Sequence, residues 1–215
     1  MFPMQRPWLL FSYLCALTWA QSAGFTVEPT GNQNVDLATG IITLPQGGRV
    51  VDPAQGIELT APYLRYKEGE LVFARQAKVV WQDTELSSGE LNIDLAEQKA
   101  ELAQAMAIEI PALSEVRAQA ATVFLADGVA VLNGKIESDL PELSADQAIV
   151  DLNTQEVLLI GSFSYLDSSG LRLSGNQPDS KLYLKLGPGQ AVSANTEVGA
   201  AIWERLSPYL ETEAD

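Results

Sequence analysis

The sequence predicts an all-β protein made of repeated, stacked β-hairpins, followed by a short C-terminal helix. Five similar segments lie at 35–52, 64–81, 93–110, 123–138 and 150–167, and their first residues are 29, 29, 30 and 27 positions apart. A repeat period of 20–50 residues is typical of stacked supersecondary units. Apolar residues spaced for a helix are absent from 25 to 190, and most Pro and Gly residues fall between the apolar runs. This region is therefore predicted to consist of strands joined by turns.

The N-terminus has the pattern of an export signal. Arg6 precedes an uncharged apolar run at 7–20, and small residues follow that run. A basic region, a short apolar region and a small-residue site are typical of a secretory signal peptide. A membrane-spanning helix needs about 20 apolar residues, which is longer than this run. We therefore predict a signal peptide at 1–20, cleaved after Ala20 or alternatively after Ala23, and a soluble periplasmic product.

Each repeat has the alternating pattern of a hairpin. Its first, third, eighth and tenth positions are apolar, and strand side chains alternate with a period of two. A four-residue polar connection separates the two pairs. The third position is predicted to face the eighth, and the first to face the tenth, so that all four lie on one face. These residues are Val35, Leu37, Ile42 and Leu44; Leu64, Tyr66, Leu71 and Phe73; Ile93, Leu95, Ala100 and Leu102; Val123, Leu125, Ala130 and Leu132; and Val150, Leu152, Val157 and Leu159.

Each repeat also carries two further short apolar runs, one before the hairpin and one after it. The runs that follow are marked by Val50, Val79, Ile108, Ile136 and Tyr165, and those that precede by Ile57, Leu86, Val116 and Leu143. A single hairpin is unstable in water, whereas a stack of hairpins buries one continuous apolar face. The repeats are therefore expected to form one domain.

The apolar pattern of the repeats ends after Leu186, and a helical pattern follows. Residues 191–215 are predicted to form a helical tail, in which Val198, Ile202 and Leu206 recur every four positions. The stretch Asn195–Glu197 is a candidate cap, and the helix is expected to end near Pro208. We expect this helix to pack on the last hairpin, with a docking helix for a partner as the alternative.

Composition excludes several classes of function. Lys and Arg number 13 against 28 Asp and Glu, and a formal charge of −15 repels nucleic-acid phosphates. Once Cys15 is removed with the signal peptide, neither Cys nor His remains, which excludes imidazole-based metal sites and His- or Cys-based nucleophilic catalysis. Asp94, Asp127 and Asp151 are expected to be solvated carboxylates. We predict no enzymatic activity, no metal, no cofactor and no nucleic-acid partner.

Two segments carry a family resemblance. The sequence resembles the OstA-like family of lipopolysaccharide-transport periplasmic proteins in two segments. These segments are LSADQAIVDLNTQEVLLIG at 143–161 and LTAPYLRYKEGELVFARQAKVVW at 59–81. There, a strand carrying Leu-x-Ala leads into a hairpin and then into a Val-x-Val-like strand. The resemblance implies an OstA-like domain at 24–190, folded as an open V-shaped β-jelly-roll that holds the acyl chains of an amphipathic glycolipid. It also implies end-to-end stacking with other OstA-like envelope proteins.

The resemblance also distinguishes branches of that family. In that family the inner-membrane component keeps a longer N-terminal helix, and the outer-membrane translocon continues into a large barrel. The short N-terminal apolar run and the end of the chain at Asp215 favour the third branch, the soluble bridging component. Terminal strands at 27–37 and 171–186 are expected to be unpaired edges, which permit head-to-tail self-association.

The candidate ligand site is the shared apolar face. The expected ligand is lipopolysaccharide or another glycolipid. An open groove and a closed core need the same apolar columns, so a structural or adhesive scaffold without lipid is the alternative, and a small polysaccharide-active enzyme is a third. The residues predicted to line the groove are Tyr66, Leu71, Phe73, Leu95, Leu102, Leu125, Leu132, Leu152 and Leu159.

Overall fold

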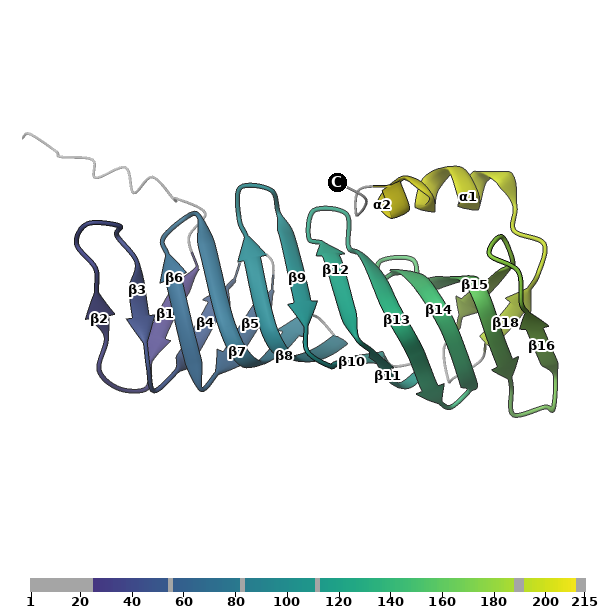
Figure 1. The fold of residues 1–215 in the computed structure, drawn as a ribbon, viewed down its shortest axis with the longest axis horizontal. Coiled ribbons are helices and arrows are strands. Elements are labelled where there is room, and N and C mark those ends of the chain that lie inside the picture. Colours follow the sequence, from purple (N-terminus) through teal and green to yellow (C-terminus); the bar gives the residue numbers. More distant parts are fainter. Residues whose placement is uncertain (1–24, 54–55, 82–83, 111–112, 188–191, 212–215) are drawn as a thin grey trace, which may run out of the picture.

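The computed structural model describes residues 25–53, 56–81, 84–110, 113–187 and 192–211. The chain forms an elongated stack of antiparallel strands, with its N-terminal strands at one end and its C-terminal strands at the other (Figure 1). The predicted signal peptide and both of its cleavage sites lie outside the described residues.

The strands pair in two layers that share five long strands. The shared strands are β7 (Leu71–Trp81), β8 (Thr84–Asp94), β13 (Val129–Asp139), β14 (Glu142–Asp151) and β15 (Glu156–Leu166). The first layer adds β2 (Asn34–Val35), β3 (Ile42–Leu44), β6 (Tyr63–Lys67), β9 (Lys99–Ala103), β12 (Ala120–Phe124), β17 (Lys181–Leu186) and β18 (Val192–Asn195). The second layer adds β1 (Thr26–Pro29), β4 (Gly48–Asp52), β5 (Ile57–Ala61), β10 (Met106–Ile110), β11 (Leu113–Ala118) and β16 (Arg172–Gly175).

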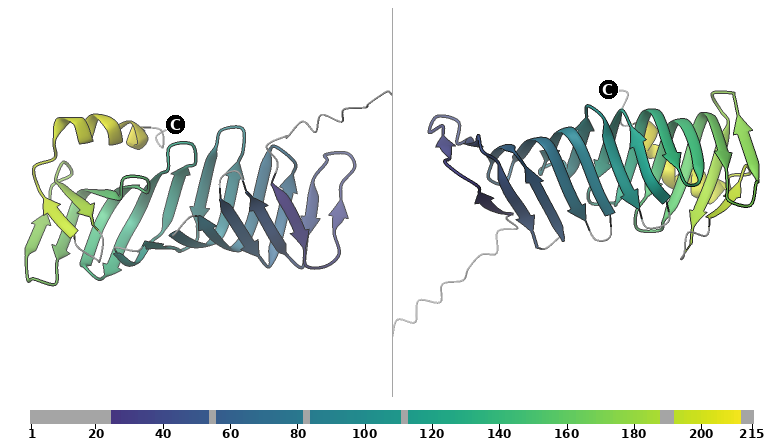
Figure 2. Two further views of the ribbon diagram at one scale, coloured as in Figure 1. Left: turned by 180° about the vertical axis from the view of Figure 1, so that it is seen from behind. Right: turned by 90° about the horizontal axis from the view of Figure 1, so that it is seen from below.

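Both layers run along the whole stack. The pairing order of the first is β2-β3-β6-β7-β8-β9-β12-β13-β14-β15-β17-β18. That of the second is β1-β4-β5-β7-β8-β10-β11-β13-β14-β15-β16. The view from below shows the strands succeeding one another along the long axis (Figure 2, right). The all-β, jelly-roll-like class is confirmed.

The long strands change layer partway along their length. In β7 the change falls at Gln76, whose φ of 50° lies in the left-handed region. Val72 is buried before this point and Trp81 after it, so the buried positions switch from even to odd numbers. Gly134 in β13 and Gly161 in β15 also have positive φ, and pairing is irregular beside both. Such irregularities bend strands, and here they join the two layers.

The core lies between the layers and contains most of the predicted apolar columns. Buried column residues include Leu44, Leu64, Ala100, Leu102, Val123, Ala130, Leu132, Val150, Val157 and Leu159. In the first repeat, Val35 and Leu37 lie outside the core and are 51% and 93% exposed. These two residues belong to the hairpin at the end of the stack, and within the described residues β2 pairs only with β3.

The predicted hairpin register is wrong. In four repeats the first position faces the eighth, in the pairs Val35–Ile42, Ile93–Ala100, Val123–Ala130 and Val150–Val157. The connection therefore begins one residue earlier than expected. In the third repeat, Asp94 Oδ1 accepts the backbone N–H groups of Ala96 and Glu97, which starts the turn directly after Asp94.

The second repeat also corrects the predicted face of two residues. Its hairpin pairs Lys67 with Leu71, which leaves a three-residue connection at 68–70 where the other repeats have four. This odd-length connection reverses the side-chain alternation of the returning strand. Val72 is therefore buried in the core, while Leu71 and Phe73 lie on the outer surface of the first layer.

The edge strands lie at the two ends of the stack. At the N-terminal end they are β1 and β2, within the predicted edge at 27–37. At the other end they are β16 and β18. The prediction is wrong for β17, because β18 pairs with it and covers its outer side.

The predicted C-terminal helix is present as α1 (Ala200–Leu206) and α2 (Pro208–Glu211), which lie across the outer surface of the first layer (Figure 1). The predicted cap is wrong, because the N-cap residue is Gly199. Asn195 instead accepts the N–H of Glu197. Pro208 begins α2, a position at which its missing N–H costs no helical hydrogen bond. None of the described helices has the length and hydropathy needed to cross a membrane.

The tail covers more of the stack than the last hairpin. Leu206 is fully buried in an outer apolar cluster with Val129, Val131, Ile149 and Leu158, which come from three different strands. At the far end of the tail, the rings of Phe124 and Tyr209 contact each other in a tilted arrangement, with centroids 4.9 Å apart and an interplanar angle of 56°. The helices therefore extend from β17 back to β12.

Candidate functional site

An apolar cavity lies between the two layers in the N-terminal half of the stack. Strands of the first layer supply one wall and strands of the second layer the other. All but two of the lining residues are apolar, the exceptions being Asp52 and Gln98. The lining consists of Phe25, Val50, Asp52, Ile57, Leu59, Val72, Val79, Trp81, Leu86, Leu91, Ile93, Leu95, Gln98, Ala100, Leu102, Val123 and Leu125.

The structure brings three of the predicted groove residues into this cavity. They are Leu95, Leu102 and Leu125, from the third and fourth repeats. Tyr66, Leu132, Leu152 and Leu159 belong to the same continuous core but lie outside the cavity. Leu71 and Phe73 are on the opposite surface of the first layer, because of the three-residue connection before them.

The second wall was missed as part of the site. Val50, Ile57, Val79 and Leu86 were predicted as strand residues, without a place in the groove. Their apolar spacing was a usable signal, since a stack of paired strands needs a second buried face. Trp81 had no comparable signal, because only its pairing with β5 and β8 places it in the wall.

Part of the cavity lining comes from hairpin turns and from the start of a second-layer strand. Leu95 and Leu125 are the first residues of their hairpin turns, and Ile57 is the first residue of β5. All three are half-buried, as is Phe25, whose ring meets Tyr66 edge-on with centroids 5.9 Å apart. These partly exposed apolar side chains form the mouth of the cavity.

The cavity is narrow in this conformation. Its volume is about 90 Å³, smaller than a cavity of roughly 150 Å³ that holds one benzene molecule. Leu132 and Leu159, further along the stack, are 1% and 0% exposed and do not line this cavity. A long chain could therefore enter only if the layers separate around the cavity.

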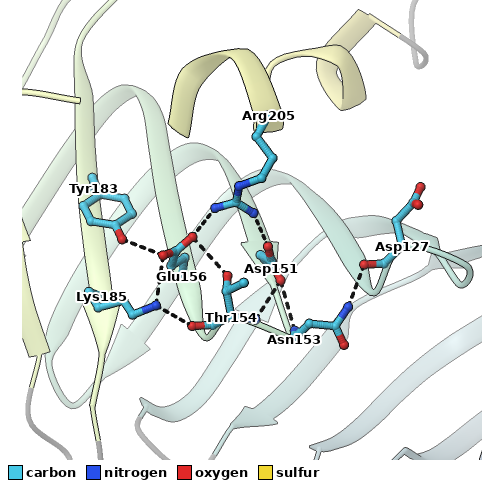
Figure 3. A network of polar contacts seen from close by, with 8 residues as sticks. All are labelled: Asp127, Asp151, Asn153, Thr154, Glu156, Tyr183, Lys185 and Arg205. Carbon is cyan, nitrogen blue, oxygen red and sulfur yellow. Dashed lines mark hydrogen bonds and ion pairs between the residues drawn. The ribbon is translucent and has the colours of Figure 1, made fainter. Parts of the chain in front are cut away.

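A polar network holds the C-terminal tail on the first layer (Figure 3). Arg205 of α1 forms ion pairs with both Asp151 and Glu156. Glu156 also accepts hydrogen bonds from the Tyr183 hydroxyl and the Lys185 ammonium group, each at 2.9 Å. Asp151 was predicted to be solvated, but its side chain is only 6% exposed. The covering helix and the ion pair with Arg205 account for the difference.

The network shifts the pKa values of its members. Burial opposes ionisation of Glu156, but hydrogen bonds from Lys185, Tyr183 and Thr154 outweigh it and lower the pKa to about 2. Burial and the bond to Glu156 raise the pKa of the Tyr183 hydroxyl to about 12. The network is thus a fixed set of charges at neutral pH, which points to a structural role.

Acidic residues do not gather into a metal site in the part of the chain that the structure describes. That part contains no group of three or more His, Cys, Asp or Glu residues arranged to hold a metal ion. Of the apolar cavity's lining residues, only Asp52 carries a carboxylate. The cavity therefore offers an apolar surface and no paired carboxylates.

Comparisons with known proteins give a structural likeness but no match in sequence. No protein-family model matches the sequence, and no curated protein sequence matches it. Among solved structures, the chain is similar to one described as "Crystal structure of LptH, the LptA homologous periplasmic component of the conserved lipopolysaccharide transport device from Pseudomonas aeruginosa". The sequence identity is 11%, the TM-score is 0.27, and the match covers 81% of this chain and 95% of that chain. The class that fold and site define here is a two-layered stack of antiparallel hairpins enclosing an apolar cavity.

Proposed function

We propose that this protein is a periplasmic carrier that binds the acyl chains of lipopolysaccharide or a related envelope glycolipid during transport to the outer membrane. The observation that carries the proposal is the apolar cavity between the layers, with Leu95, Leu102 and Leu125 in its wall. Acyl chains suit such a lining, because each methylene group that leaves water contributes about 0.8 kcal/mol. The headgroup would remain at the mouth, in contact with water.

Binding would require the two layers to move apart around the cavity. The mouth residues are already partly exposed to water, so separation of the two layers exposes little more of their apolar surface. These residues are Phe25, Ile57, Leu95 and Leu125. An inserted chain would restore the lost contacts between the layers. Opening would take place in the N-terminal half, since the residues that line the cavity lie there and Leu132 is not among them.

A photo-reactive side chain at Leu102 tests this proposal in living cells. Leu102 lines the cavity, whereas Leu132 occupies the same repeat position in the fully packed core, and Asp94 is at the start of a turn. We expect crosslinks to a glycolipid from position 102 and few from positions 132 and 94. If position 102 yields only crosslinks within the protein, the carrier function is wrong.

A structural scaffold without lipid is the second candidate function. It is favoured by the C-terminal half of the stack, where Leu132, Leu159, Leu182 and Leu184 are all at most 1% exposed. Such complete burial is what packing within a scaffold requires. The crosslinking experiment separates the two functions, because a scaffold gives the same result at positions 102 and 132.

The carrier would work as part of a longer assembly. The unpaired edges at β1 and β2 and at β16 and β18 lie at opposite ends of the stack. Another copy, or another OstA-like envelope protein, could add a strand at either end. Such addition would extend the core between the layers from one molecule to the next.

A further inference from the structure

A polar cleft separate from the apolar cavity lies at the C-terminal end of the stack. Its volume is about 500 Å³, within the 300–1,000 Å³ typical of small-molecule sites. Its lining comes from β16, from the connection between β16 and β17 with the first residue of β17, and from the tail before α1 together with α1 itself; Phe163 of β15 completes it. The residues used below are Ser174, Asp179, Ser180, Lys181, Thr196 and Trp203.

The cleft combines one aromatic face with several hydrogen-bonding groups. Trp203 supplies an indole ring, and the Lys181 ammonium nitrogen lies 3.9 Å from its centroid. Asp179 supplies a carboxylate, while Ser174, Ser180 and Thr196 supply hydroxyl groups. Asp179 and Lys181 bring opposite charges, so the lining has no net charge to attract an ion.

We propose that this cleft binds a neutral saccharide ring. A sugar ring has an apolar face of C–H groups that can stack on an indole, and a rim of hydroxyl groups that need donors and acceptors. Trp203 meets the first requirement, and Asp179 with the hydroxyl groups meets the second. An apolar ligand would leave those polar groups unpaired, and an anion would meet the Asp179 carboxylate in a protein of net charge −15. The proposal does not rest on the carrier function.

Lys181 covers the indole face in the empty cleft and would move when the ring binds. A cation–π contact at a partly exposed site is worth about 0.5–1 kcal/mol, so displacing the ammonium group costs little. The flexible lysine stem lets the group swing to the rim, where it can donate to a sugar hydroxyl. The cleft thus keeps a polar group over Trp203 until a ligand replaces it.

The floor of the cleft depends on a glycine. Gly175 lies against Phe163 and Ser180, and a Cβ atom there would be 2.5 Å from Phe163 Cε1 and 2.6 Å from Ser180 Cβ. Both neighbours are themselves lining residues. A side chain at this position would displace the wall of the cleft.

Saturation-transfer NMR on the full chain tests the proposal, with the methyl glycosides of glucose, galactose, mannose and N-acetylglucosamine as probes. We expect saturation of the ring protons of at least one glycoside. Trp203→Phe leaves a smaller ring for stacking, and Asp179→Asn removes a charged acceptor, so each should weaken binding about tenfold. The matched control is Trp81→Phe, in the apolar cavity, which should leave binding unchanged.

Three results would overturn the proposal. The first is an absence of saturation transfer to all four glycosides. The second is transfer that both Trp203→Phe and Asp179→Asn leave unchanged while circular dichroism shows the fold intact. The third is tighter binding of glucose 6-phosphate than of methyl glucoside, which would make the cleft an anion site. Failure of the lipid crosslink at Leu102 would leave the saccharide result unaffected, because the two sites share no residue.

Discussion

Glu156 is the residue on which most of the polar network depends. It accepts hydrogen bonds from Tyr183, Lys185 and Thr154 and pairs with Arg205 of α1. Its side chain is 12% exposed, so these contacts are only weakly screened by water. One carboxylate thereby connects β15, β17 and the C-terminal tail.

This geometry predicts a pH-dependent contribution to stability. The folded pKa of Glu156 is about 2, below its ordinary value of 4.5. The stabilisation is therefore fully present above about pH 4.5 and is lost as the pH falls towards 2. We expect Glu156→Gln to lower the free energy of unfolding at neutral pH by on the order of 2 kcal/mol, and the gap to close towards pH 2.

Urea unfolding of both proteins across this pH range measures the gap. Glu101→Gln is the matched control, since Glu101 is 56% exposed and its ion pair is with Lys99. An exposed pair of this kind contributes at most about 1 kcal/mol. A gap between wild type and Glu156→Gln that stays constant from neutral pH to pH 2 would contradict the prediction.

At the scale of the element, the backbone conformation of Gln76 sets the point at which β7 passes from the first layer to the second. A non-glycine residue with φ of 50° is strained, and this residue lies where β7 passes from the first layer to the second. The strand pairs without interruption on both sides of it, with β6 and then with β5. The conformation of one residue therefore decides which side chains of β7 face the core.

We expect Gln76→Gly to stabilise the protein by about 1 kcal/mol, because glycine adopts positive φ without steric cost. Ser87→Gly in β8 is the control, since Ser87 is an exposed strand residue without positive φ. There, glycine should destabilise by about 0.5–1 kcal/mol. Thermal unfolding compares the two variants with wild type, and destabilisation by Gln76→Gly would show that the glutamine side chain matters more than its φ.

At the scale of the whole molecule, the stack has open edges at both ends. In the terminal hairpin, the backbone N–H of Asp36 donates to the carbonyl oxygen of Ile41. Successive residues of an antiparallel strand direct their N–H groups alternately towards and away from the partner strand. The N–H of Val35, which is opposite Ile42, therefore points away from β3. Val35 is also 51% exposed. Its backbone is thus available to a strand of another molecule.

We predict head-to-tail self-association that strengthens with salt, because salt screens the repulsion between copies of charge −15. Val35→Pro should abolish it, since proline removes the outward donor and leaves the hydrogen bonds to β3 in place. Leu37→Ser, in the turn of the same hairpin, is the control and should associate as wild type does. Sedimentation velocity at low and high salt measures this; a wild-type monomer under both conditions would refute it.

The repeat by itself determined the fold class and three of the cavity residues. Apolar residues at fixed positions every 27–30 residues require a continuous buried face, whatever the details of pairing. Leu95, Leu102 and Leu125 could therefore be predicted as inward-facing, and they line the apolar cavity. The spacing of Ile202 and Leu206 likewise predicted a helix with one apolar side.

Tertiary structure alone decided which apolar residues lie in the cavity, which in the packed core and which outside. The three-residue connection at 68–70 turns Phe73 outward although it occupies an inward position of the repeat. The second wall, including Trp81, is formed by strands distant in sequence, and the tail buries Asp151 under Arg205. The physical reason is that alternation specifies faces within one strand, whereas turn length, bends and the contacts between layers determine what each face meets.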